Sequence, residues 1–278
     1  MTRVAASIPV LEWAAERAQL TDAALTKRFP KWNDWVSGEA EPTLRQLEDF
    51  ARMSRTAIGY FFLPEPPAIE LPVPDFRTVG DNGPTDPSSN LLDTIYLCQQ
   101  RQDWYRDYAR IERFDPIEFV GSANIRQQAN DVANRIRVAI GLSVQDRRQL
   151  RTWEEALRQL ILRTEELGVL VMITSVVGSN THRSLDVGEF RGFALADDLA
   201  PLIFVNGSDS KSAQMFTLMH ELAHIWLGAT GVSDPQPGRI SDLATERWCN
   251  LVAAEVLMPI DAVRASATPG APVFDEMR

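Results

Sequence analysis

The segment Phe216-Thr217-Leu218-Met219-His220-Glu221-Leu222-Ala223-His224 decides the fold of the C-terminal part of the chain, because a helix here places two histidines one turn apart. Positions i and i+4 lie on the same face of a helix, so both imidazoles can reach a single Zn²⁺ at roughly 2.0–2.1 Å. Glu221 is then the general base of the H-E-x-x-H arrangement, since it can take a proton from metal-bound water. The segment predicts a zinc centre in which His220 and His224 are ligands and Glu221 is catalytic.

A catalytic zinc also needs a third protein ligand and keeps its fourth position for water or substrate. We predict that Glu246 supplies this ligand, because it begins one stripe of a second predicted helix that would face the first. The stripe repeats at i, i+4, i+7 and i+11 and comprises Glu246, Asn250, Ala253 and Leu257. Four other side chains with ligand chemistry stay open as alternatives: Asp242, Glu255, Cys249 and His182.

The pattern extends over four segments of the C-terminal part. They are Phe190-Arg191-Gly192-Phe193-Ala194, Pro201-Leu202-Ile203-Phe204-Val205-Asn206-Gly207, the segment from Phe216 to His224, and the stretch from Glu246 to Pro259. Together they resemble the ImmA/IrrE family of metallopeptidases. The resemblance implies a gluzincin-like domain whose zinc ligands would be His220, His224 and Glu246.

Several members of that family cleave or inactivate helix-turn-helix repressors of mobile elements or stress genes. The resemblance therefore implies that this chain is a zinc-dependent endopeptidase whose substrate is a repressor or another helix-turn-helix regulator. Two other classes of protein stay open as alternatives. One is a DNA-binding regulator, and the other is an antitoxin-like adaptor, each with a structural or sensory zinc site.

Residues 1–64 predict a bundle of about five short helices. The pattern Trp35-x-x-Gly38-x-x-x-Pro42-Thr43-Leu44-x-x-Leu47 near its middle resembles a phage-repressor (XRE-type) helix-turn-helix domain. The resemblance implies that the third helix, at about residues 31–36, would enter the DNA major groove. The candidate DNA contacts are Lys27, Arg28, Lys31 and Asn33. Because Asp34 would face phosphates unfavourably, a module that docks a protein partner is the alternative.

Residues 65–90 predict a linker, because repeated prolines forbid helix and favour extended backbone. Residues 91–278 then combine helices at about 91–113, 125–140 and 153–167 with strands at 169–173, 189–195 and 201–205. We therefore expect an α+β fold with a small sheet beside the motif helix. Family members with this arrangement commonly continue further, so we expect a short or truncated peptidase domain at the C-terminus.

The last strand before the motif helix is our candidate for the edge that binds substrate. In zinc peptidases such a strand often pairs with the substrate backbone by β-augmentation. The residues of this candidate edge are Pro201, Leu202, Ile203, Phe204 and Val205. The hydrogen-bond donor that would stabilise the oxyanion of the reaction is not identified by the sequence. The candidates are a backbone amide, Arg239, Arg247 and the tyrosines at 60, 96, 105 and 108.

The composition narrows the class of protein further. A formal net charge of −10 and a pI of about 4.9 argue against a chain that coats nucleic acid through bulk electrostatics. No apolar run reaches the roughly 18–20 residues of a membrane helix, and the N-terminus lacks a signal-peptide core. Cys98 and Cys249 lie far apart and form no disulfide framework. We expect a cytoplasmic protein whose partners are a protein substrate and, through residues 1–64, DNA.

Overall fold

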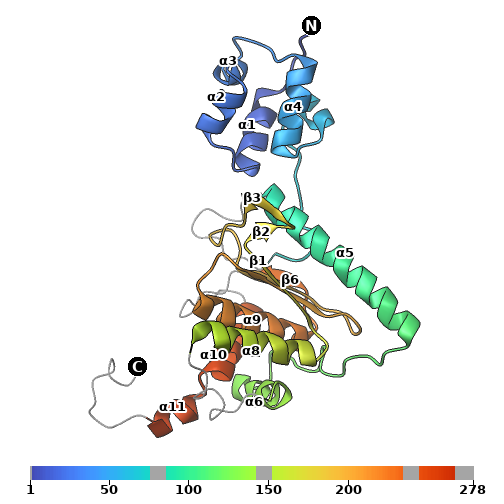
Figure 1. Cartoon of the computed structure of the whole chain (residues 1–278), viewed down its shortest axis with the longest axis vertical. Coiled ribbons are helices and arrows are strands. Elements are labelled where there is room, and N and C mark those ends of the chain that lie inside the picture. Colours follow the sequence, from blue (N-terminus) through green and yellow to red (C-terminus); the bar gives the residue numbers. More distant parts are fainter. Residues whose placement is uncertain (1, 76–85, 142–151, 234–243, 267–278) are drawn as a thin grey trace. The chain divides into compact units, whose positions relative to one another are not determined.

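The computed structural model describes four stretches of the chain: residues 2–75, 86–141, 152–233 and 244–266 (Figure 1). The chain divides into two compact units, Met1–Pro72 with Pro84–Thr94 and Val73–Gly83 with Ile95–Arg278. The first unit is helical, and the second contains a small mixed sheet. The predicted α+β class is therefore confirmed.

The first unit is built from five short helical segments. They are α1 (Ile8–Arg17), α2 (Asp22–Arg28), α3 (Trp32–Val36), α4 (Leu44–Ser54) and the 3₁₀ helix η1 (Ile58–Phe62). Threonines begin two of the helices. The Thr21 hydroxyl accepts a hydrogen bond from the Ala24 amide at 3.3 Å. At α4, Thr43 and Gln46 form a reciprocal capping box, in which the Thr43 amide donates to Gln46 Oε1 at 2.9 Å.

An aromatic cluster forms the core of this unit. Trp32 and Trp35, on successive turns of α3, are 5% and 2% exposed. The Trp32 ring lies 5.0 Å from Phe50 of α4, and Phe50 lies 5.4 Å from Phe61 of η1, measured between ring centroids. Such ring contacts stabilise a core beyond the contribution of the apolar area that they bury. The two tryptophans are therefore packing residues, as the sequence predicts.

The second unit is organised around a four-stranded sheet in the order β1-β5-β4-β6. The strands are β1 (Leu170–Thr174), β4 (Gly192–Leu195), β5 (Leu202–Asn206) and β6 (Gly231–Ser233). β1 runs parallel to β5, while β4 is antiparallel to both β5 and β6. A separate hairpin consists of β2 (Val176–Val177) and β3 (Asn180–Ser184).

The predicted substrate edge at Pro201–Val205 is wrong. This segment forms β5 and the residue before it, and β5 pairs with β1 from Leu202 to Asn206 and with β4 from Leu202 to Val205. Its residues are all buried. Because both sides of the strand are already hydrogen-bonded, its backbone cannot pair with a substrate strand. The end of the sheet nearest the histidine motif is β6 instead.

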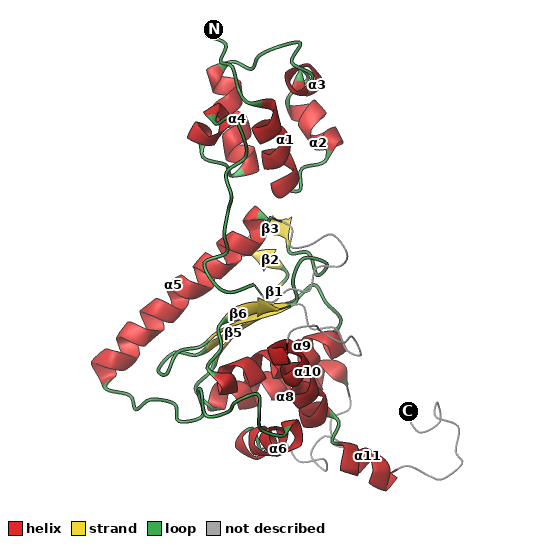
Figure 2. Cartoon of the chain, turned by 180° about the vertical axis from the view of Figure 1, so that it is seen from behind, coloured by secondary structure: helices red, strands yellow, loops and turns green. Residues whose placement is uncertain are grey.

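Helices cover both faces of this sheet (Figures 1 and 2). On one face lie α8 (Trp153–Glu166), α9 (Lys211–Leu227) and α10 (Ala244–Leu257), and α6 (Ala129–Ala139) packs against α10. On the other face lies the long α5 (Ser89–Glu112), and α11 (Ile260–Ser266) follows α10. The predicted helix at residues 125–140 begins only at Ala129. Among the described residues, no helix combines the length and the apolar character needed to cross a membrane.

The sheet also binds part of the Pro-rich linker. The Val232 amide of β6 donates a hydrogen bond to the Pro74 carbonyl at 2.9 Å, and Asp75 forms a parallel bridge with Val232. Val73 is 7% exposed. The linker is therefore held at Pro74 and Asp75, which lie along the outer side of β6. Residues 76–85, including Phe76, lie outside the described part.

Candidate metal centre

Helix α9 positions the two motif histidines. The Ser210 hydroxyl caps its first turn, and Gly228 ends it with a left-handed φ of 67°. α9 is apolar on nearly all sides because it lies between the sheet and the helices α8 and α10. His220 and His224 are 0% and 1% exposed. Two imidazoles fully removed from water need a polar partner, and the next helix provides one.

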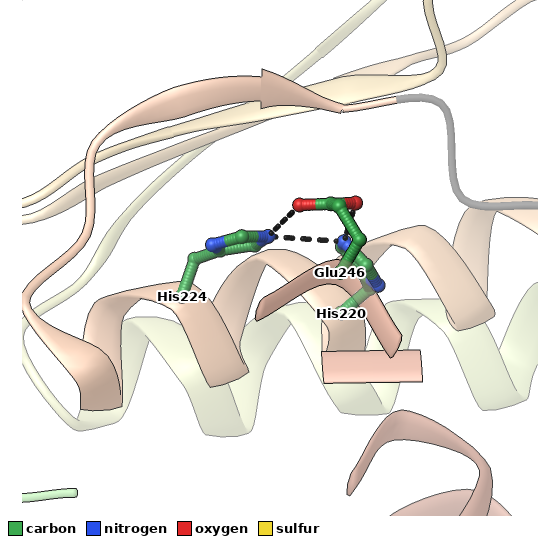
Figure 3. Close-up of side chains that lie close together, drawn as sticks. All are labelled: His220, His224 and Glu246. Atoms are coloured by element: carbon green, nitrogen blue, oxygen red, sulfur yellow. Dashed lines mark hydrogen bonds and ion pairs between the residues drawn. The ribbon is translucent and has the colours of Figure 1, made fainter. Parts of the chain in front are cut away.

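Glu246, in the first turn of α10, is that partner. Its side chain points at both imidazoles from the facing helix (Figure 3). Glu246 Oε2 lies 3.2 Å from His220 Nε2, and Oε1 lies 2.9 Å from His224 Nε2. The two Nε2 atoms are 3.1 Å apart. Two nitrogens and a carboxylate therefore form a small closed triangle in a buried site.

This triangle fits a tetrahedral metal. Ligand atoms held at roughly 2.0–2.1 Å from a zinc ion, at the tetrahedral angle, are about 3.3–3.4 Å apart. The three distances of 2.9–3.2 Å come close to that spacing. Among the residues that the structure describes, His220, His224 and Glu246 form the one group of three ligand side chains that could hold a metal ion.

The protonation of the three groups also suits a metal. Burial alone would raise the pKa of Glu246, but His220 and His224 lower it to about 2, so this carboxylate is ionised at neutral pH. Burial lowers the pKa of His224, which favours the neutral imidazole. Neutral imidazole and ionised carboxylate are the forms that bind metals.

Glu221 lies beside this group and is fully buried. Burial raises its pKa well above the usual range, Glu246 adds to the shift, and the nearby Ser233 hydroxyl offsets only part of it. Room for the carboxylate comes from Gly192 of β4, where an added Cβ would lie 3.0 Å from Glu221 Oε1. Ser233 of β6 also approaches the site, with its hydroxyl 3.5 Å from His224 Nε2.

The described alternatives for the third ligand lie elsewhere. Cys249 is buried but does not join the metal-ligand group, and burial raises its thiol pKa well above the usual range. The Glu255 carboxylate accepts a hydrogen bond from the Ile260 amide at 3.2 Å. His182 is exposed on β3. Asp242 lies outside the described residues.

The structure also removes several candidates for the donor that would stabilise the oxyanion. Three of the four tyrosines, at 96, 105 and 108, belong to α5, which lies across the sheet from α9 (Figures 1 and 2). The sheet therefore separates them from the metal group. Arg247 is exposed on α10, and Arg239 lies outside the described residues. Sequence reasoning overlooked Gly192 and Ser233 as neighbours of the site. Gly192 falls within a quoted segment, but Ser233 belongs to no recognisable pattern.

The candidate DNA contacts are all exposed on the first unit. Lys27 and Arg28 end α2, Lys31 precedes α3, and Asn33 lies within it. Arg28 also lies 3.6 Å from Asp49, measured between Nη2 and Oδ2. These positions leave the side chains accessible to a partner, and DNA binding stays a prediction.

Comparison with known families bears on the second unit. Residues 164–273 match the family model of the IrrE N-terminal-like domain, Peptidase_M78. The matched segment contains α9 and α10 with the whole metal-ligand group, and the match supports a peptidase domain there. No curated protein matches the chain. The helix-turn-helix resemblance falls outside the matched residues and stays a prediction.

Proposed function

We propose that the chain is a zinc-dependent endopeptidase, with zinc held by His220, His224 and Glu246. The observation that carries this proposal is the closed triangle of two imidazole nitrogens and a carboxylate, buried beside a further carboxylate that is not a ligand. A structural zinc site is usually closed by a fourth protein ligand. The described residues offer three, and a fourth position left to water is the property of a catalytic site.

The chemistry divides between the metal and Glu221. Bound zinc would polarise the scissile carbonyl and lower the pKa of the attacking water. Glu221 takes a proton from that water and returns it to the leaving amine. Burial raises the pKa of Glu221, so this carboxylate takes up a proton more readily than an exposed one, as a general base must. Burial of the site keeps bulk water away and strengthens each charge interaction.

The proposed substrate is a protein, and among proteins a repressor or another helix-turn-helix regulator. The match of residues 164–273 to the IrrE N-terminal-like family supports this class, as does the resemblance of the first unit to such regulators. A substrate segment would approach beside Ser233, at the end of β6, since β5 is paired on both sides. Pro74 already binds β6 at Val232.

The test is cleavage by full-length protein of purified helix-turn-helix regulators encoded by neighbouring genes, followed by gel electrophoresis and mass spectrometry. Glu221→Gln should keep its zinc and lose turnover by about 10²–10⁴-fold, the usual contribution of a general base. Glu255→Gln, a carboxylate of α10 outside the metal-ligand group, is the matched control and should cleave like the parent.

Full activity of Glu221→Gln would refute the assigned role of this carboxylate. Zinc binding without cleavage by the parent, together with binding of an operator DNA or a protein partner, would favour the other class. The chain would then be a DNA-binding regulator or antitoxin-like adaptor with a structural or sensory zinc.

A further inference from the structure

The outward face of α5 carries an exposed apolar seam. The inward face of this helix is buried, with Ile95, Cys98 and Ala109 at most 2% exposed. On the opposite face, Trp104 is 71% exposed and Ile111 is 76% exposed. A helix that covers one face of a sheet normally turns polar side chains to water, so exposed tryptophan and isoleucine on that side mark an interaction surface.

The aromatic side chains of the seam contact one another. The rings of Trp104 and Tyr108 stack with centroids 6.2 Å apart and planes inclined by 7°. Tyr108 also meets Phe114 edge-on at 5.8 Å. The seam repeats at spacings of four, four and three residues, which is the spacing that lets two helices pack against each other. Its residues are Gln100, Trp104, Tyr108 and Ile111. Fixed side chains lose little entropy on binding.

The charges beside the seam exclude two classes of partner. Exposed acidic and basic residues are mixed along α5: Arg101, Asp103, Asp107, Arg110 and Glu112. A surface for nucleic acid or for an anionic membrane would be basic throughout. A mixed row of charges fits a partner with its own mixed row.

A second copy of the same helix supplies that row. In an antiparallel pair, the register that places Arg101 opposite Glu112 of the second copy also places Asp103 opposite Arg110, because both pairs share one midpoint. The two-fold axis repeats each pair, so four attractive contacts result. Arg110 lies 3.4 Å from Asp107 of its own chain, so in the dimer two acidic residues, this Asp107 and Asp103 of the second copy, would share it.

The same register also interleaves the apolar side chains. Trp104 would lie beside Tyr108 of the second copy, and Ile111 would lie between Gln100 and Trp104 of that copy. Present ion pairs do not prevent this exchange of partners. Asp103 now pairs with Arg106 at 2.6 Å, but Asp103 is largely exposed, and pairs of this kind contribute little.

We propose that α5 is a homodimer interface, in which two copies of the chain pack antiparallel along Gln100, Trp104, Tyr108 and Ile111. With Tyr96 and Phe114 at its ends, the seam exposes on the order of 500 Å² of apolar side chain per copy. A stable complex usually buries about 800 Å² per partner, so the dimer should be weak and should form at micromolar concentration.

Sedimentation velocity of the full-length chain, from about 1 to 200 µM, tests the proposal over the range expected of a small interface. The parent should show a reversible monomer–dimer equilibrium. Trp104→Glu should weaken it at least tenfold, since charge would enter the apolar seam. Trp153→Glu, at a tryptophan of α8 that is 65% exposed, is the matched control and should leave the equilibrium unchanged.

A charge swap tests the register. Arg101→Glu alone and Glu112→Arg alone should each weaken the dimer, because like charges would then face each other, and the double variant should restore it. A parent that stays monomeric throughout the range would overturn the proposal. An unchanged dimer affinity in Trp104→Glu would also overturn it, as would a double variant that dimerises more weakly than both single variants.

Discussion

Gly192→Ala tests how closely the sheet lies on the motif helix. Gly192 lies in β4, opposite α9. A Cβ added there would lie 2.6 Å from Thr217 Cγ2, 2.8 Å from the Phe204 carbonyl oxygen and 3.0 Å from Glu221 Oε1. Thr217 and Glu221 belong to α9, and the carbonyl belongs to the backbone of β5, the strand paired with β4. The added methyl group therefore pushes α9 away from the sheet and β4 away from β5. Overpacking of this kind costs about 2–3 kcal/mol.

Thermal unfolding followed by circular dichroism measures this cost. For a chain of this size, the loss lowers Tm by about 4–10 °C. Gly59→Ala is the control, because a Cβ at Gly59 meets nothing within 4 Å. Adding Thr217→Ala to Gly192→Ala should restore part of the loss, since it removes the shortest contact and leaves the Phe204 carbonyl in place. If Gly192→Ala melts like the parent, α9 does not lie this close to β4, and the reasoning about the site of Glu221 fails with it.

Three further substitutions test polar interactions that stabilise the two units. Gln102→Leu should lower the free energy of unfolding by about 2–3 kcal/mol in urea titration, because it leaves two buried carbonyls without the donor that now reaches them at 2.8 and 2.9 Å. Burial alone would raise the pKa of Asp197, but two backbone amides and Arg106 lower it, so its ion pair stabilises the fold at neutral pH and this stabilisation is lost as pH falls through the depressed pKa. The stability difference between the parent and Asp197→Asn should accordingly shrink below about pH 4, and a difference independent of pH would contradict this. Thr43→Ala should cost the first unit about 1 kcal/mol, read as a lower Tm of that unit, because the capping box of α4 is lost.

The metal-ligand group was accessible to sequence reasoning because its geometry is mostly local. Two histidines four residues apart must share a helix face, whatever the rest of the chain does. The position of Glu246 requires a second helix to pack against the first, and the apolar pattern of α10 indicates that packing. Val252, Ala253 and Val256 are completely buried. The predicted buried stripe of α10 differs from the observed one at two positions. Leu257, which the stripe includes, is only partly buried, and Cys249, which it leaves out, is fully buried.

The sheet order was not accessible in the same way, because it depends on pairing between distant segments. The error at Leu202–Val205 had a visible signal, however. Four apolar residues in a row, without alternation, are typical of a strand buried on both faces and paired on both sides, not of an edge. The contact between Pro74 and Val232 had no such signal, since more than 150 positions separate the two residues along the chain. Ser233 likewise reaches the site only through a pairing between distant segments, that of β6 with β4.

The central claim is that His220, His224 and Glu246 hold one zinc ion. Its most direct test is the zinc content per chain of the purified protein, measured by inductively coupled plasma mass spectrometry, beside Glu246→Ala and the control Glu255→Ala. The account predicts about one zinc per chain in the parent and the control and a near-complete loss in Glu246→Ala, as expected for a three-ligand site. A parent without zinc, or Glu246→Ala with undiminished zinc, would contradict it.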